Sequence, residues 1–460
     1  MNRNAHSSDM KYGDLDLLFL LEHYRKNQLD PIEVIEEVIS RVKKKTCSAE
    51  WIYLEPEERL RDRANTLKSF DRSLPLYGIP FSIKDNINVK GMPTAAGCTA
   101  FSFYPDNTSS VVTRLLDMGG ILIGKNTMDE FATGVVGVRS DPHPVNPFDE
   151  EYICGGSSSG SGVVVAKKCV SFSLGSDTGG SGRVPAALCN VVGFKPTPHV
   201  LSNDNMIYAN RSIDCIPIFS KTVSEAKYVF EAVLSTTASR KKTYANSAQD
   251  SPSIFANARI AIPRAEDLKF FGDETSQKSF SDVVEVLREL GSIVVEIDFD
   301  PFVKAGNMLF EGAYLNERYT SVGPFIKSHS DQVNPVVADI ICSAEFTLQS
   351  EIWGDIYKLN EYRILAEETM RSVDILLTPT TGTIYKIEEL NQDPIRLNQN
   401  MAYYTNFGNL LDLSIVSVPA YFRTDGLPFG ISFMAPMLGD DTVLEFAAAW
   451  EAISEITPGC

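Results

Sequence analysis

Three short motifs contain residue types that could together make a serine nucleophilic. Lys84 ends the stretch GIPFSIK, Ser157 lies in a glycine- and serine-rich run, GGSSSG, and Ser181 lies in a second one, GSDTGGSGR. A serine needs a base to attack at neutral pH, and a lysine that burial keeps neutral can be that base while a second serine relays the proton. The glycines before Ser181 allow backbone N–H groups to converge on one point, as a tetrahedral oxyanion requires. One such loop alone indicates only a turn, but the three together favour nucleophilic catalysis.

A competing motif makes Ser158 the nucleophile. Gly156 to Gly160 matches the G-x-S-x-G elbow of histidine-dependent hydrolases, in which a strand precedes the serine and a histidine and an acid follow later in the chain. The strand expected before this run is poor, and the only downstream histidines, His199 and His329, lie in no motif. A Ser158-based hydrolase is therefore an alternative to the lysine-dependent one.

No pattern in the sequence predicts a metal or cofactor site. The five histidines are scattered, and the eight cysteines include no C-x-x-C pair, which is typical of reduced thiols rather than of a zinc site or a disulfide framework. The stretch GGILIGKN resembles a phosphate-binding loop, but its apolar interior is typical of a strand, and Asn126 stands where that motif needs Ser or Thr. We expect neither a metal nor a cofactor.

Composition indicates a folded protein that binds neither nucleic acid nor membranes. Of the 460 residues, 43% are hydrophobic and 22% are charged, which is ordinary for a globular protein. The formal net charge of −18 would repel phosphate backbones and anionic lipid surfaces. No apolar stretch approaches the roughly 20 residues that span a bilayer. We expect a cytoplasmic protein in which an anionic substrate needs a local cationic clamp.

The motifs must be positioned by an alternating series of helices and strands. Asp30 caps a helix with apolar residues at helical spacing, a second helix is predicted over 108–118, and a strand at 121–123 is followed by a capping box at 127–130. Further buried strands are predicted at 259–262, 293–297, 375–379 and 431–433, with helices at 275–290 and 346–370. This alternation predicts an α/β fold with a mixed, largely parallel central sheet covered by helices on both faces.

The chain is expected to form one domain over residues 1–460. We divide it into a helical N-terminal part (1–70), a core with the three motifs (71–230), a polar surface insertion (235–253) and a half that supplies the substrate pocket (254–460). The insertion is predicted because the run STTASRKKTYANSAQDSPS has no periodic apolar residues.

From about residue 30 to residue 455, the sequence resembles the amidase signature family. The stretch GIPFSIKD, the GGSSSGS loop and the run GSDTGGSGRVP occur in the family's order, followed by GFKPT. The resemblance implies a mixed sheet of about eleven strands covered by helices, and a Ser–Ser–Lys triad. In that triad Lys84 would be the base, Ser157 would sit on a cis peptide and relay the proton, and Ser181 would attack the amide.

The resemblance also implies supporting residues around the triad. Ser158 would steady Lys84. Asp177 would pair with Arg183 to hold the loop of residues 175–183 that carries Ser181, which we call the nucleophile loop. The oxyanion hole would consist of the backbone N–H groups of four consecutive residues: Thr178, Gly179, Gly180 and Ser181.

Three stretches look like those of allophanate hydrolases, which act in the second step of ATP-dependent urea degradation: FATGVVGVRS at 131–140, NRSIDC at 210–215 and EGAYLNERY at 311–319. By this resemblance Arg318 would bind the substrate carboxylate, and the pocket would include Thr133 and Gly134. A tyrosine of that group, eight residues before the arginine, also binds the carboxylate. Phe310 holds that position here and cannot donate a hydrogen bond.

The sequence therefore predicts a serine amidohydrolase that releases ammonia from a small urea-derived amide, with allophanate favoured. Longer allophanate hydrolases continue into a C-terminal domain, whereas this sequence ends at Cys460 without one, either as a truncated piece or as a stand-alone amidase. Expected partners are the small amide, a second copy of the chain and a urea carboxylase of the same pathway. Two alternatives stay open: the amidase subunit of a tRNA-dependent glutamine amidotransferase, and a non-catalytic scaffold with this fold.

Overall fold

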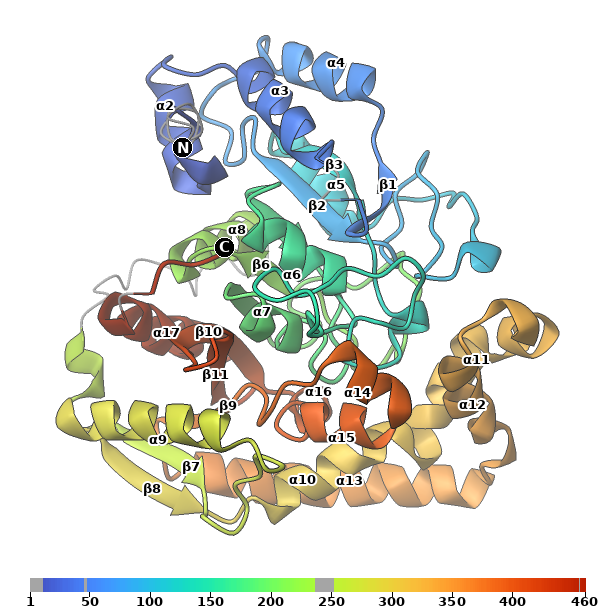
Figure 1. The fold of residues 1–460 in the computed structure, drawn as a ribbon, viewed down its shortest axis with the longest axis vertical. Helices are drawn as coiled ribbons and strands as arrows, with labels where there is room; N and C mark the ends of the chain where they lie inside the picture. The colour runs from blue at the N-terminus through green and yellow to red at the C-terminus, as the bar shows by residue number, and fades with distance from the viewer. Residues whose placement is uncertain (1–10, 45–47, 236–251, 455) are drawn as a thin grey trace.

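The computed structural model describes residues 11–44, 48–235, 252–454 and 456–460 (Figure 1). Within these residues one eleven-stranded sheet has the order β1-β3-β2-β4-β6-β5-β10-β11-β9-β7-β8. Its strands are β1 (Trp51–Leu54), β2 (Pro80–Lys84), β3 (Ile121–Asn126), β4 (Phe172–Leu174), β5 (Val192–Lys195), β6 (Ile218–Ser220), β7 (Arg259–Pro263), β8 (Ile293–Ile297), β9 (Ile375–Pro379), β10 (Ser414–Phe422) and β11 (Pro428–Ala435).

Helices cover this sheet along its whole length. Those of the first half are α2 (Leu17–Arg25), α3 (Pro31–Val42), α4 (Glu57–Leu67), α5 (Ser110–Asp117), α6 (Ser159–Ala166), α7 (Val184–Leu188) and α8 (Val223–Ser235). Those of the second half are α9 (Glu274–Glu289), α10 (Asp300–Asn307), α11 (Gly312–Ser328), α12 (Pro335–Cys342), α13 (Gln349–Met370), α14 (Ile387–Gln392), α15 (Arg396–Ala402), α16 (Phe407–Leu410) and α17 (Asp440–Ser454).

Alternate side chains of the central strands enter two cores, one on each face of the sheet. Ile375 and Leu377 of β9 pack into a core with α8, α9 and α17, whereas Leu376 between them packs into a core with α10, α13 and α16. Val416 and Ile415 of β10 divide in the same way. This period of two is the geometry of a strand buried on both faces. The predicted mixed sheet with helices on both faces is therefore confirmed.

The strand directions differ from the predicted largely parallel sheet. β2 is parallel to β3 and β4, and β7 is parallel to β8 and β9, but the other six neighbouring pairs are antiparallel. A helix connects the parallel strands β2 and β3, whereas only residues 423–427 connect β10 and β11. So short a connection turns the chain back beside itself and imposes antiparallel pairing. The alternation of helices and strands in the sequence predicted the layers of the fold, but not whether neighbouring strands run parallel or antiparallel.

Local signals predicted some element ends well and others poorly. Helix α3 begins at Pro31, directly after the predicted cap residue Asp30, whose backbone N–H donates to the carboxylate of Glu33 (3.1 Å). The predicted helix after the capping box at 127–130 is wrong, because only a 3-10 turn, Glu130–Ala132, forms there and Phe131 takes a φ of +50°. Helix α13 begins at Gln349 instead of residue 346, after a separate 3-10 turn at Ser343–Phe346.

Most of the predicted polar insertion, residues 236–251, lies outside the described residues. Among the described residues, no helix combines the length and the apolar character needed to cross a membrane. In the same residues, no group of three or more His, Cys, Asp and Glu side chains could hold a metal ion.

Candidate active site

The strands bring the three predicted motifs to one edge of the sheet. β2 ends at Lys84, and β4 leads directly into the loop that carries Ser181. These strands are parallel neighbours, with Ile83 opposite Leu174, so their carboxyl ends lie side by side, where open α/β sheets place their sites. Ser157 reaches the same place from the segment before α6, and its peptide bond to the preceding glycine is cis, as the resemblance implied.

Lys84 and the two serines form a continuous line of polar atoms. Nζ of Lys84 lies 2.7 Å from Oγ of Ser157, which lies 2.9 Å from Oγ of Ser181. All three side chains are buried, and Ser181 keeps only 3% of its surface exposed. These distances allow a proton to pass from Ser181 through Ser157 to Lys84.

Burial makes Lys84 a usable base. Removal of the ammonium from water, with a small contribution from the positive charge of Arg318, lowers the pKa of Lys84 to about 7 despite the opposing effect of three aspartates: Asp129, Asp177 and Asp214. Near neutral pH a substantial fraction of Lys84 is therefore the free amine. A surface lysine would be almost entirely charged at this pH.

Ser176, which the sequence analysis did not single out, holds Lys84 in place. Nζ of Lys84 contacts both the hydroxyl (2.9 Å) and the backbone carbonyl (3.2 Å) of Ser176. Ser158 was expected to steady Lys84, but its hydroxyl donates to the same Ser176 carbonyl at 3.1 Å, so its support is indirect. The elbow alternative finds no histidine here, because His199 contacts the carbonyl of Ser212 and His329 stacks on Phe325.

The four backbone N–H groups predicted for the oxyanion hole differ in whether they already have an acceptor. The N–H of Gly180 already donates to the carboxylate of Asp177 (3.0 Å), so the prediction is wrong for this donor. Within the described chain, the backbone N–H groups of Thr178, Gly179 and Ser181 have no acceptor. Three donors of this loop thus remain available beside the Ser181 hydroxyl, as the predicted oxyanion hole requires.

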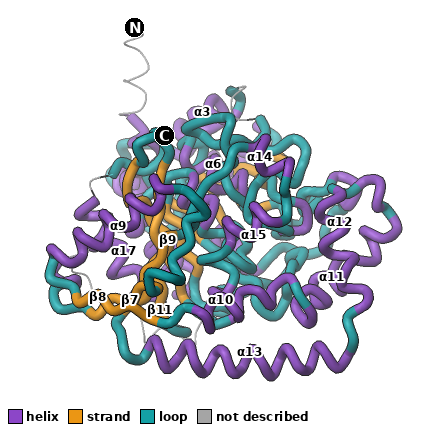
Figure 2. The backbone as a smooth tube through the Cα atoms, turned by 60° about the horizontal axis from the view of Figure 1, so that its bottom comes forward, coloured by secondary structure: helices purple, strands orange, loops and turns teal. Residues whose placement is uncertain are grey.

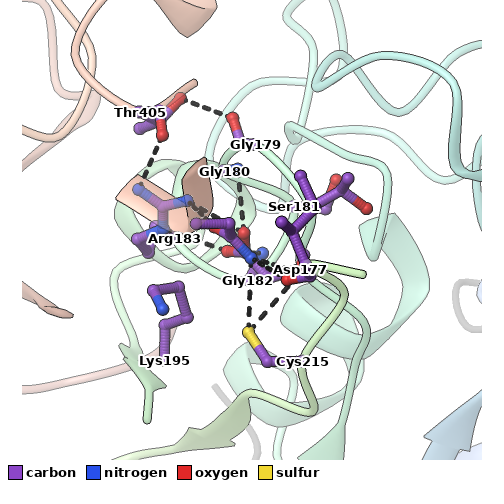
Figure 3. A network of polar contacts seen from close by, with 12 residues as sticks. Asp177, Gly179, Gly180, Ser181, Gly182, Arg183, Lys195, Cys215 and Thr405 are labelled. Carbon is purple, nitrogen blue, oxygen red and sulfur yellow. Dashed lines mark hydrogen bonds and ion pairs between the residues drawn. The ribbon is translucent and has the colours of Figure 1, made fainter. Parts of the chain in front are cut away.

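An ion pair between Asp177 and Arg183 holds the nucleophile loop in place, as Figure 3 shows. Nε and Nη2 of Arg183 donate to the two carboxylate oxygens of Asp177 at 3.0 and 2.8 Å, and both residues are fully buried. Arg183 also donates to the backbone carbonyl of Thr405 and to the side chain of Asn409, which come from the far half of the chain. Because the carboxylate also accepts from Gly180 and Gly182, the loop has little freedom to move.

Arg318 of α11 lies inside the protein rather than on a helix surface. Its side chain is 1% exposed, with Nη1 3.1 Å from the carbonyl of Ala132 and 3.2 Å from Oγ1 of Thr133, and Nη2 3.2 Å from Oδ1 of Asn210. Nε has no partner among the described residues. Burial lowers the pKa of Arg318 to about 10, so the guanidinium stays charged at neutral pH. A buried cation with an unused donor suits an anionic ligand.

The other predicted substrate residues lie around this guanidinium. Thr133 contacts Arg318 directly, whereas Gly134 packs against Arg139, whose Nη1 donates to the Thr133 carbonyl at 2.9 Å. The ring of Phe310 faces Arg318, with its centre 5.2 Å from the guanidinium carbon. Phe310 thus contacts the cation through its ring face, where the tyrosine of allophanate hydrolases would add a hydroxyl.

A cavity of about 340 Å³ adjoins the nucleophile loop. Its lining includes Phe310, Tyr403, Asn307, Asn400 and Asn406. A Cβ atom built on Gly179 would lie 2.8 Å from Oδ1 of Asn406, which shows how closely the cavity wall approaches the loop. Phe310 is the point at which this cavity borders on the guanidinium of Arg318.

Two polar residues that sequence reasoning missed connect the loop to α11. Oδ1 of Asp214 accepts from the Thr178 hydroxyl (2.6 Å), and burial raises the pKa of Asp214 to about 6. Asn210 donates to the Tyr314 carbonyl of α11 and accepts from Arg318. Both residues lie in the stretch NRSIDC, which resembles allophanate hydrolases. Neither the residue types nor their spacing distinguish them from polar residues on a surface.

Comparisons with known proteins identify the family of this chain. A family model described as Amidase matches residues 33–444, so the chain belongs to the amidase family and is an amidohydrolase. It is 37% identical over 405 residues to the urea amidolyase of Saccharomyces cerevisiae, covering 86% of this chain but only 22% of that protein. It is 30% identical over 475 residues to one of the subunits of the glutamyl-tRNA(Gln) amidotransferase of Halothermothrix orenii, covering 96% of this chain and 98% of that one.

Among solved structures, the chain superimposes on the allophanate hydrolase of Kluyveromyces lactis with a TM-score of 0.86 and 33% sequence identity. The match covers 94% of this chain and 72% of that one. The chain thus spans about a fifth of the curated yeast protein and most of the solved allophanate hydrolase chain.

Proposed function

We propose that this chain hydrolyses allophanate, or a closely related urea-derived amide with a carboxylate, and releases ammonia. The observation that carries the proposal is the line of contacts from buried Lys84 through Ser157 to Ser181, beside the buried guanidinium of Arg318. The line from Lys84 to Ser181 would cleave the amide, and the Arg318 guanidinium would favour an anionic substrate. Similarity to a urea amidolyase and to an allophanate hydrolase supports the choice of substrate.

In the proposed reaction, Oγ of Ser181 attacks the terminal amide carbon while its proton passes to Ser157, and the proton of Ser157 passes to Lys84. The developing oxyanion accepts hydrogen bonds from the free N–H groups of the nucleophile loop. When the C–N bond breaks, the relay returns the proton to the leaving nitrogen and ammonia departs. Water then cleaves the ester on Ser181 by the same relay, leaving a dicarboxylated product.

The substrate would enter through the 340 Å³ cavity with its carboxylate toward Arg318. Thr133 and Arg139 would hold Arg318 in position by direct contact and through the Thr133 carbonyl. Gly134 would keep the wall free of a side chain, since a Cβ atom there would lie 2.6 Å from Nη1 of Arg139. The expected urea carboxylase partner and the cytoplasmic location belong to the same proposal.

A second candidate is an amidase subunit that delivers ammonia to an aminoacyl-tRNA partner. The H. orenii protein favours it, because the match covers nearly the full length of both chains. Purified chain should be incubated with allophanate, biuret, malonamate and glutamine, and ammonia should be measured from each. Release from allophanate and malonamate without a partner supports the first proposal, whereas release from glutamine alone supports the second.

A further inference from the structure

The side chain of Asn86 is buried close to Lys84, two residues further along the chain. It is 1% exposed, and its Nδ2 donates to the hydroxyl of Ser176 at 3.1 Å and to the backbone carbonyl of Ile207 at 3.0 Å. The same Ser176 hydroxyl lies 2.9 Å from Nζ of Lys84. A line of contacts therefore connects Ile207 to the base through Asn86 and Ser176.

We propose that Asn86 is a positioning residue that acts on the base through the Ser176 hydroxyl. It holds the amine of Lys84 against Ser157 and favours the uncharged amine over the ammonium. This inference rests on the proposed role of Lys84 as the base, but not on which amide the chain hydrolyses.

Loops carry the residues that surround the base. Asn86, Ser176 and Ile207 lie in the loops that begin where β2, β4 and β5 end. Loops are drawn in teal in Figure 2, where they occupy much of the molecule between the strands and helices α11 and α12. A site on loops is well ordered only if hydrogen bonds between its side chains lock it. The hydrogen bonds around Lys84 therefore determine where its amine lies.

The segment 205–207 fixes the orientation of the Asn86 amide. Of the two N–H bonds on Nδ2, one is directed at the Ile207 carbonyl and the other at the Ser176 hydroxyl. Turning the amide over would place Oδ1 against the Ile207 carbonyl oxygen, where neither atom can donate. The backbone already joins the two segments, since the N–H of Ile207 donates to the Asn86 carbonyl at 2.8 Å. The N–H of Asn88 likewise donates to the Asn205 carbonyl at 3.0 Å, so the side chain is not needed to hold the segments together.

Only the donor end of the Asn86 amide is used. Its Oδ1 is buried and has no hydrogen-bond partner among the described residues. A buried acceptor without a partner costs stability, so stability alone would favour an apolar side chain at this position. What the asparagine adds is its pair of donated hydrogen bonds, and one of them reaches the group that holds the base.

The relay determines what Lys84 needs from Ser176. A neutral amine has two N–H bonds and one unshared electron pair, and the pair must point at Ser157 to take its proton. The two N–H bonds are then left for the hydroxyl and the carbonyl oxygen of Ser176, at 2.9 and 3.2 Å. The Ser176 hydroxyl must therefore stay in place as an acceptor, and the Asn86 amide anchors that oxygen.

The charges around Lys84 show why the donor end of Asn86 favours the free amine. Burial and the positive charge of Arg318 lower the pKa of Lys84, and three buried aspartates raise it: Asp129, Asp177 and Asp214. The N–H end of an amide is partly positive, so Asn86 opposes protonation of Lys84 in the same sense as Arg318. An acceptor in place of this donor would reverse the effect.

Kinetics of the full chain test the proposal, with ammonia measured from whichever of allophanate, malonamate, biuret and glutamine it hydrolyses. Asn86→Leu removes both donated hydrogen bonds with little change in volume, and the backbone hydrogen bonds to the segment 205–207 remain. We expect kcat to fall at least about tenfold, because the base is less well placed. KM should change little because Asn86 does not line the cavity, and the thermal midpoint should change little because an unpaired buried acceptor is removed as well.

A second substitution tests whether Asn86 acts through Ser176. Ser176→Ala removes the hydroxyl that links Asn86 to the base and should itself lower kcat. In a chain that already carries Ser176→Ala, adding Asn86→Leu should change kcat by less than about twofold, because the link is already lost. Losses that multiply would show that Asn86 acts by another route and would overturn the proposal, as would a normal kcat in Asn86→Leu.

Asn86→Asp tests the electrostatic effect. A carboxylate in place of the donor favours the ammonium, so the fall in kcat/KM at low pH should have its midpoint at least about one pH unit higher. Asn205→Asp is the matched control, because Asn205 lies in the segment 205–207 but its Nδ2 donates to the Thr108 carbonyl instead of Ser176. An unchanged midpoint in Asn86→Asp, or an equal shift in Asn205→Asp, overturns the proposal.

Lys84→Arg separates a failure of this inference from a failure of the proposed function. If Lys84→Arg is inactive while Asn86→Leu and Asn86→Asp match the unmodified chain, only the role of Asn86 is wrong. If Lys84→Arg keeps a near-normal rate, Lys84 is not the base, and both the relay and the role of Asn86 are wrong.

Discussion

The nucleophile loop and helix α11 meet at the same site but are held in very different ways. The carboxylate of Asp177 accepts four hydrogen bonds, from both nitrogens of the Arg183 fork and from two N–H groups of its own loop. Arg318 makes three contacts of 3.1–3.2 Å and keeps one nitrogen without a partner among the described residues. The polar groups that hold the nucleophile loop, which we call the catalytic side, are thus all paired within the protein. Arg318 on α11, which we call the substrate side, keeps one N–H donor for a ligand. Changes to the catalytic side should abolish turnover, and changes to the substrate side should alter substrate selectivity.

The largest effect should come from Ser181→Ala. We expect kcat to fall by at least about a thousandfold, because no other described side chain replaces the attacking oxygen at the end of the relay. The thermal midpoint should change little, since one small hydroxyl is removed. Ser158→Ala is the control, and its loss should be much smaller because, among the described residues, the Ser158 hydroxyl donates only to the Ser176 carbonyl. Adduct formation at Ser158 with a fluorophosphonate probe would contradict this division of roles.

Lys84 should give the catalytic side a characteristic pH dependence. The active form is the neutral amine, whose pKa is about 7, so protonation below that pH removes the base. We expect kcat/KM to fall about tenfold per pH unit below pH 7 and to level off above it. Lys84→Arg should lose nearly all activity because a guanidinium does not deprotonate. A Lys84→Arg enzyme with a near-normal rate would rule out the relay.

The substrate side should show a smaller effect that depends on the substrate. Arg318→Gln should reduce kcat/KM for allophanate by about ten- to a hundredfold, since a charge-assisted hydrogen bond contributes about 1.5–3 kcal/mol. A neutral amide such as biuret should change little. Arg211→Gln is the matched control, because Arg211 is exposed and lies over the ring of Tyr208. Equal losses on both amides would mean that Arg318 only supports the fold.

Phe310→Tyr should have the smallest effect, and in the opposite direction. The added hydroxyl would lie at the ring that faces Arg318 and could donate to the same carboxylate. We expect kcat/KM for allophanate to rise by a few-fold, with no gain on biuret. A comparable gain on both substrates would indicate better packing of α11 instead of a new contact with the anion.

Residues within strong local motifs were predictable from the sequence, and residues that join distant segments were not. The triad and the Asp177–Arg183 pair were identified because each lies in a motif of a few residues. Ser176 and Asp214 were missed although each lies in a stretch that the sequence analysis quoted, because their partners, Lys84 and Thr178, come from other segments of the chain. The Gly180 donor was assigned wrongly for a related reason: whether an N–H is free depends on a carboxylate three residues away turning back to it.

The sequence by itself determined the layers of the fold and the chemical types at the site, because apolar periodicity and short motifs act over a few residues. Tertiary structure decided the strand directions, the burial of Arg318 and the pKa of Lys84. These properties depend on connections and neighbours far along the chain. Arg318 contacts residues 132, 133 and 210. Lys84 is shielded from water by the segments around Ser157 and Ser176. Desolvation is a property of the packed site, so no pattern of adjacent residues could predict its strength.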